Sequence, residues 1–143
     1  RAMARSKTYV YVLDMAPVRN PFLDRYALHV GKTLDTVAMR DAVHVLCGEH
    51  DFSSFQATGS EVKTTVRTIT VSEVAVSGHK VYVWMQGSGF LRHMVRNIVG
   101  TLVLVGKGRL KPEDMKRILD LHDRSHAGPT ARPQGLYLMG VEY

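Results

Sequence analysis

The chain has 143 residues, 45% of them hydrophobic and 22% charged, with a formal net charge of +6; these values suit one globular domain with its own core and favour a polyanionic partner. No apolar run reaches the length of a membrane span, and the N-terminal stretch lacks the apolar segment and cleavage site of a signal peptide. Cys47 is the only cysteine, which excludes an internal disulfide and favours a reducing, intracellular compartment, with the cytoplasm as the default.

The first half of the chain predicts a strand, a loop and a helix. Residues 7–15 alternate β-branched and aromatic side chains and predict a strand, and residues 16–32 contain two prolines and predict a loop. Residues 33–50 carry apolar side chains at helical spacing. Thr33 or Asp35 is the candidate N-cap of this helix, Gly48 is its expected end, and a polar loop follows over residues 51–61.

The second half predicts a hairpin, two helices and a last strand. Residues 63–78 and 79–89 predict two strands that turn near Gly78. A long helix follows, with Ser88 as its candidate N-cap, apolar residues recurring at helical spacing from Leu91 to Val105, and Gly106 and Gly108 at its end. Residues 111–123 predict a helix with Pro112 at its first position. Residues 124–135 predict a loop, and residues 136–143 predict a strand.

The predicted order of elements is β-α-β-β-α-α-β. This is the α+β, ferredoxin-like or RRM-like plan with one extra helix, in which an antiparallel sheet carries its helices on one face. We expect residues 1–143 to form a single domain. Strand aromatics such as Tyr9 and Tyr11, or Tyr82 and Trp84, could stack on RNA bases as in RNA-binding modules of this topology, although packing is the commoner role of such residues. The fold class alone therefore decides little about function.

Basic residues are segregated along the chain. No Asp or Glu occurs from Val74 to Pro112, and a second acid-free stretch opens the chain. A nucleic-acid partner needs such a separation of charge, because phosphates are bound by clustered Lys and Arg. The two stretches together contain Arg1, Arg5, Lys7, Lys80, Arg92, Arg96, Lys107, Arg109 and Lys111.

Several common chemistries lack their motifs. The stretch "GKGRLKP" does not have the spacing of a phosphate-binding P-loop. His122 and His126 have no cysteine partner and no further zinc-ligand pattern, and we expect no metal. Cys47 falls on the apolar side of a predicted helix and is expected to be a core residue rather than a nucleophile.

Polar residues interrupt the long helix near its start. Arg92 and Arg96 lie four residues apart on one helical face, and His93 and Asn97 share the next. Arg96 has apolar neighbours on both sides, so it is expected at the border of the core, where a guanidinium needs a carboxylate or phosphate partner. A solvated helix edge with a long apolar stem is the alternative.

The sequence of this helix closely resembles a motif of the TruA family of tRNA pseudouridine synthases. The matching stretch is "GSGFLRHMVRNIVGTLVLVGKG", and further blocks resemble the same family in the correct order: "KTYVYVL", "GEHDFSSF", "VRTI" and "DRSHAGPTARPQGLYLMGVEY". The resemblance covers essentially the whole chain. It implies an antiparallel sheet with flanking helices, of pseudouridine synthase type.

The resemblance also implies a reaction and a set of site residues. The family isomerises uridine to pseudouridine in the anticodon stem-loop of tRNA without metal or cofactor, acts as a homodimer, and flips the target base into a pocket. Tyr9 matches the tyrosine that stacks on the base, Arg96 the arginine that pairs with the catalytic aspartate, and Leu136 an apolar residue of the base pocket. From charge and helical facing, we expect a second group to contact RNA: Arg5, Lys7, Arg92, His93, Asn97, Lys107 and Arg109.

One family motif is missing from this sequence. The catalytic aspartate lies in a "GRTDxGVHA"-type motif, and none of the aspartates here has such a setting. Because the family carries that motif in its N-terminal half, we expect this chain to be the C-terminal half of a longer synthase and to be inactive by itself. A non-catalytic RNA-binding module and a dimerisation domain are the alternatives.

Overall fold

The computed structural model describes residues 4–143; Arg1, counted above among the basic residues, lies outside this range. The described part contains strands, helices and three short 3-10 turns. The principal elements are β1 (Ser6–Asp14), β2 (Leu28–His29), α1 (Thr36–His44), β3 (Gly48–Asp51), β4 (Val66–Ser77), β5 (Lys80–Gly87), α2 (Met94–Gly106), α3 (Pro112–Leu121) and β6 (Leu136–Glu142).

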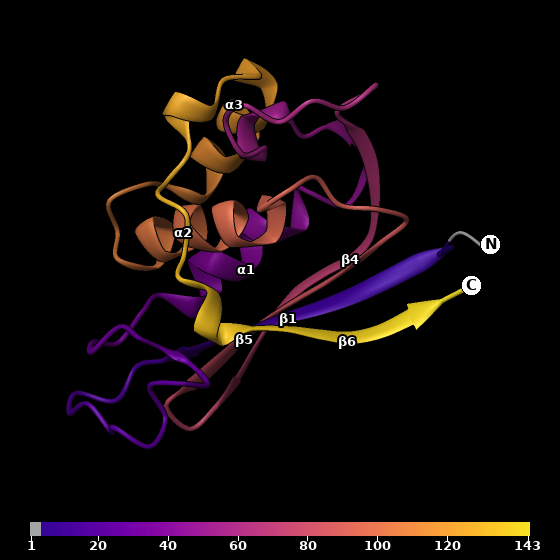
Figure 1. The fold of residues 1–143 in the computed structure, drawn as a ribbon. Helices are drawn as coiled ribbons and strands as arrows, with labels where there is room; N and C mark the ends of the chain where they lie inside the picture. The colour runs from indigo at the N-terminus through magenta and orange to yellow at the C-terminus, as the bar shows by residue number, and fades with distance from the viewer. Residues whose placement is uncertain (1–3) are drawn as a thin grey trace.

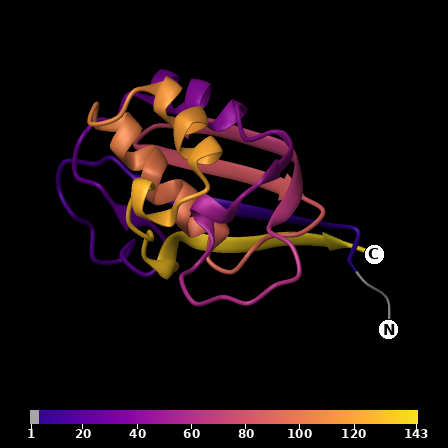
Figure 2. The same ribbon diagram turned by 90° about the horizontal axis from the view of Figure 1, so that it is seen from above.

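The strands form one six-stranded sheet in the order β2-β1-β5-β4-β3, with β6 paired to β1. All pairs are antiparallel except β1–β2, in which Leu13 and Asp14 run parallel to Leu28 and His29. The sheet is therefore mixed, and the prediction of a wholly antiparallel sheet is wrong at this short pair. The α+β class is confirmed, and the three helices of residues 4–143 lie on one side of the sheet (Figures 1 and 2).

The alternation of side chains along the strands explains how the sheet is covered. Tyr11 and Leu13 of β1 are completely buried under the helices, as are Val83 and Met85 of β5. Tyr9 is paired with Met85, so it shares this covered face, whereas Trp84 points to the open face and is 39% exposed. The two pairs of strand aromatics therefore lie on opposite faces of the sheet.

Two short strands differ from the sequence prediction. Asp35 caps α1 by accepting a hydrogen bond from the Ala38 amide, but the helix ends at His44, earlier than expected. Gly48 does not simply terminate it: with φ of 102° this glycine opens β3, which pairs with the start of β4. β2 likewise forms within the predicted loop. Both strands form through backbone pairing with residues that are distant in sequence. They are too short to show an alternating pattern, so no local signal predicts them.

Helix α2 begins later than predicted. Its N-cap is His93, in the left-handed conformation with φ of 60°, rather than Ser88. The Ser88 amide instead donates to the carbonyl of Thr68 in β4, and the Ala57 amide donates to the Arg92 carbonyl. These contacts hold the segment before the helix in a non-helical path. No helix within residues 4–143 has both the length and the apolar character needed to cross a membrane.

Candidate functional site

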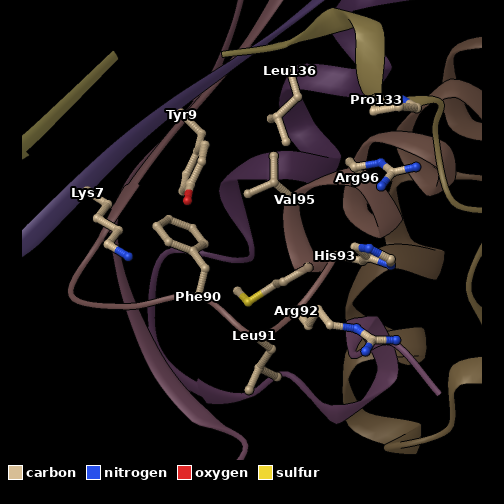
Figure 3. A pocket seen from close by; sticks show the side chains of 11 residues that line it. Lys7, Tyr9, Phe90, Leu91, Arg92, His93, Val95, Arg96, Pro133 and Leu136 are labelled. Carbon is tan, nitrogen blue, oxygen red and sulfur yellow. The ribbon is translucent and has the colours of Figure 1, made fainter. Parts of the chain in front are cut away.

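A cavity of about 330 Å³ opens on the helix side of the sheet, within the size range of ligand pockets. Its walls come from the start of β1, the segment leading into α2, and the turn before β6, three regions that are distant in sequence. Figure 3 shows that apolar and aromatic side chains form its centre, while basic side chains lie around its margin.

Tyr9 and Leu136 form part of the apolar wall. Tyr9 extends from β1, and its ring makes a T-shaped contact with the ring of Phe90, with centroids 5.1 Å apart and planes at 87°. Leu136 begins β6 opposite Tyr11, and its side chain points into the same cavity, as Val95 does (Figure 3). The structure thus brings together two of the residues that the sequence predicted as a base pocket. Phe90 was not predicted; the glycine-rich segment around it was its only signal.

Arg96 lines the cavity and is partly buried. Its Nε donates to the Ala131 carbonyl at 2.7 Å, and the Ala131 amide donates back to the Arg96 carbonyl at 3.1 Å. The terminal nitrogens of the guanidinium lie beyond this contact, and within residues 4–143 no carboxylate forms a salt bridge with them. Arg96 is therefore oriented by a backbone carbonyl, and no salt bridge within residues 4–143 neutralises its charge.

Arg92 and His93 lie at one side of the cavity and Lys7 at the other (Figure 3). The pKa of His93 is lowered by desolvation first, and then by the positive charges of Arg96 and Arg92. The lowered pKa favours the neutral imidazole of His93, which can still offer a hydrogen bond. The left-handed backbone of this residue sets the direction in which its imidazole leaves the chain.

Asn97 was predicted to face RNA, and this prediction is wrong because the residue is completely buried. Its Nδ2 donates to the Phe55 carbonyl at 2.8 Å. Its Oδ1 accepts from Thr130 Oγ1 at 2.6 Å and from Arg124 Nη2 at 3.1 Å. Since α2 starts only at Met94, His93 and Asn97 do not belong to one exposed helical face. Both polar atoms of the Asn97 side chain are therefore bound to other groups of the protein.

The other predicted RNA contacts are not gathered at this cavity. Lys107 and Arg109, at the far end of α2, line a second cavity of about 310 Å³ together with Arg132, and Arg5 is exposed before β1. Arg132 was not predicted. No group of three or more potential metal-ligating side chains occurs within residues 4–143.

Comparison with known proteins assigns a family to this arrangement. A family model described as tRNA pseudouridine synthase matches residues 42–143. The tRNA pseudouridine synthase A of Ralstonia nicotianae is 45% identical over 147 residues, which cover 100% of this chain and 54% of the relative. The tRNA pseudouridine synthase A 2 of Clostridium perfringens is 44% identical over 144 residues, covering 100% and 59%.

The chain belongs to the tRNA pseudouridine synthase family, and the resemblance found in the sequence is confirmed. A third relative, the tRNA pseudouridine synthase A of Pelobacter propionicus, is 45% identical over 140 residues, covering 98% of this chain and 57% of its own length. The chain thus spans a little over half the length of the curated relatives that it matches.

Proposed function

We propose that this chain supplies one side of the active site of a tRNA pseudouridine synthase, and that residues 1–143 form its C-terminal, ferredoxin-like half. The observation that carries the proposal is the convergence of Tyr9, Arg96 and Leu136, from three separate parts of the chain, on one cavity. Family membership supports the same reaction, since the relatives are named for it.

The proposed reaction needs positioning and charge stabilisation rather than a change of oxidation state. The bond between ribose C1′ and uracil N1 breaks, a bond between C1′ and C5 forms, and a proton moves from C5 to the freed nitrogen. No atom is gained or lost overall. A uridine flipped out of its stack would place its base in the apolar centre of the cavity, against the Tyr9 ring and the Leu136 side chain. The Tyr9 hydroxyl is the candidate acceptor of the C5 proton.

Arg96 is the proposed partner of the nucleophilic aspartate, which this sequence does not supply. Its Nε is bound to the Ala131 carbonyl, which leaves the two terminal nitrogens for a bidentate carboxylate pair. The positive charge would keep the aspartate ionised, which a nucleophile needs. The isolated chain is accordingly expected to be inactive.

Basic residues around and beyond the cavity are the proposed tRNA contacts. Lys7 and Arg92 flank the base pocket and would bind phosphates next to the flipped nucleotide, with His93 as a hydrogen-bonding neighbour. Lys107 and Arg109, with Arg5, would contact more distant parts of the RNA. We further propose that the full-length enzyme is a homodimer, in which one tRNA contacts both copies.

Pseudouridine formation on an unmodified tRNA transcript tests this proposal. The gene's full-length product and this chain are assayed side by side under identical conditions. Activity in the longer product alone supports a half-site that lacks its aspartate. Activity in this chain would mean that one of its own carboxylates is the nucleophile, and would overturn the proposed division of the site. Absence of activity in both would refute the proposed function.

A second candidate function is RNA binding without catalysis, and the open sheet face favours it. Trp84 is 39% exposed there, on the same face as Tyr82, as in modules that stack bases on a sheet. Trp84→Ala would abolish RNA binding if the sheet is the binding surface. In the proposed synthase, substitution of Lys7 or Arg92 weakens RNA binding instead, and Trp84→Ala retains RNA binding.

A further inference from the structure

Segment 128–132, which precedes β6, lies directly on the backbone of α2. A Cβ atom at Gly100 would stand 1.6 Å from the Pro129 carbonyl oxygen, and one at Gly128 would stand 2.8 Å from the Gly100 oxygen. Glycine is therefore required on both sides of this contact. The Gly128 amide donates to Thr101 Oγ1 at 2.9 Å. The segment is thus held against the helix one turn beyond Arg96.

A cluster of polar side chains anchors the same segment. We call Asn97, Arg124 and Thr130 the Asn97 cluster. Both Thr130 and Arg124 donate to Asn97 Oδ1, and Arg124 also donates to Thr130 Oγ1 at 3.2 Å and to the Gly128 carbonyl at 2.8 Å. The acceptors of this partly buried arginine are all neutral. Its charge therefore strengthens hydrogen bonds that organise the backbone rather than forming an ion pair.

The anchored segment carries the group that orients Arg96. Ala131 follows Thr130 directly, and its carbonyl accepts from Arg96 Nε across 35 positions of sequence. The next carbonyl, that of Arg132, accepts from the buried Tyr11 hydroxyl below it. Without the Asn97 cluster, the position of the segment relative to the cavity would depend on these two carbonyls, the Gly128 and Ala131 amides and the glycine contact.

We propose that Asn97, Arg124 and Thr130 are positioning residues that hold the Ala131 carbonyl in place and thereby orient the Arg96 guanidinium at the margin of the cavity. None of the three lines that cavity, and Asn97 is completely buried, so they act through the segment. The catalytic consequence rests on the proposed function. The orientation of Arg96 does not, and it can be measured in this chain directly.

The test compares three variants. Thr130→Val removes the hydroxyl that donates to Asn97, while Thr130→Ser keeps it. Thr65→Val is the matched control, because Thr65 Oγ1 also donates to a side-chain oxygen at 2.6 Å, that of Asp51, but has no link to the segment. Both threonines lie near the surface, so the folded chain is expected to tolerate the substitutions.

The first readout is the exchange with water of the Arg96 Nε proton, measured by NMR in isotope-labelled chain. Thr130→Val should raise the exchange rate about tenfold, whereas Thr130→Ser and Thr65→Val should keep it within about twofold of wild type. Equal exchange rates in all variants would overturn the proposal, because Arg96 would then be oriented independently of the Asn97 cluster.

The second readout is the kinetics of the full-length enzyme. Thr130→Val should lower kcat about tenfold without raising KM for tRNA, and the Thr65→Val control should match wild type. Equal kcat values for Thr130→Val and Thr65→Val would refute the catalytic role of the cluster. A full-length wild type without activity would refute the proposed function instead, while the proton-exchange result would still decide whether the cluster orients Arg96.

Discussion

Arg96 makes one observed contact and is proposed to make a second, and a lysine could not make both. One nitrogen of its planar guanidinium is bound to Ala131, and the others remain for a carboxylate. Arg96→Lys keeps the positive charge but loses the planar set of nitrogens that can bind two partners at once. We expect a loss in kcat of about 100-fold in the full-length enzyme, with tRNA affinity nearly unchanged. Single-turnover kinetics and a binding titration measure the two effects.

Arg92→Lys is the control for this prediction, because Arg92 is exposed on the same cavity margin and has no Ala131 contact. It should keep most of the rate. Equal losses in the two variants would show that charge alone, and not the orientation of the guanidinium, is what the reaction uses.

Tyr11 makes the stability of the folded protein depend on pH in the alkaline range. Burial raises the pKa of its phenol to about 12, although the charges of Arg96 and Arg132 oppose this shift. The unfolded chain ionises this group near pH 10, so the unfolded state loses its proton first. The free energy of unfolding therefore falls as pH rises from about 10 to about 12, by roughly 3 kcal/mol in total.

Urea unfolding at a series of pH values measures this effect. Tyr11→Phe should be less stable at neutral pH, because the Arg132 carbonyl loses its donor, and should lack this contribution to the alkaline slope. A wild type and variant with identical slopes above pH 10 would contradict the prediction.

At the scale of elements, the contact between α2 and the segment before β6 leaves no room for a side chain. Gly100→Ala would place a Cβ against the Pro129 carbonyl, and backbone at this contact cannot rotate away as a flexible side chain can. We expect the free energy of unfolding to fall by about 3 kcal/mol. Gly140→Ala is the matched control, since nothing lies within 4 Å of its Cβ position in β6. Chemical denaturation of both variants measures this difference. Equal free energies of unfolding would show that the segment before β6 moves aside at little cost.

At the scale of the whole molecule, the positive charge predicts how the proposed tRNA partner would be bound. With 19 basic and 13 acidic residues, and a long acid-free stretch around the cavity, tRNA binding should weaken linearly in a plot of log affinity against log salt concentration. Arg92→Gln should lower the steepness of this plot by about 1. Arg117→Gln should leave it unchanged, because Arg117 lies on α3 and is paired with Asp114. A flat salt response would contradict a phosphate-based binding mode.

Local patterns in the sequence predicted the long elements well. Strand β1 and helix α2 were predicted because many residues of each repeat one period. Asp35, one of two N-cap candidates for α1, is the N-cap, and it could be proposed because capping is a short-range interaction. β2 and β3 were missed because their few residues are held by pairing with distant strands. The start of α2 was misplaced because contacts with Thr68 and Ala57, rather than a local cap, hold the residues before it.

The sequence by itself determined the α+β class, the separation of charge and the family resemblance, because these depend on composition, periodicity and motif order. Only the tertiary structure decided that Asn97 faces inward and that Arg96 meets Ala131, and it alone showed Tyr9 and Leu136 on the walls of one cavity. The physical reason is distance along the chain: Thr130 bonds Asn97 from 33 residues away, and no local pattern carries information about such a partner.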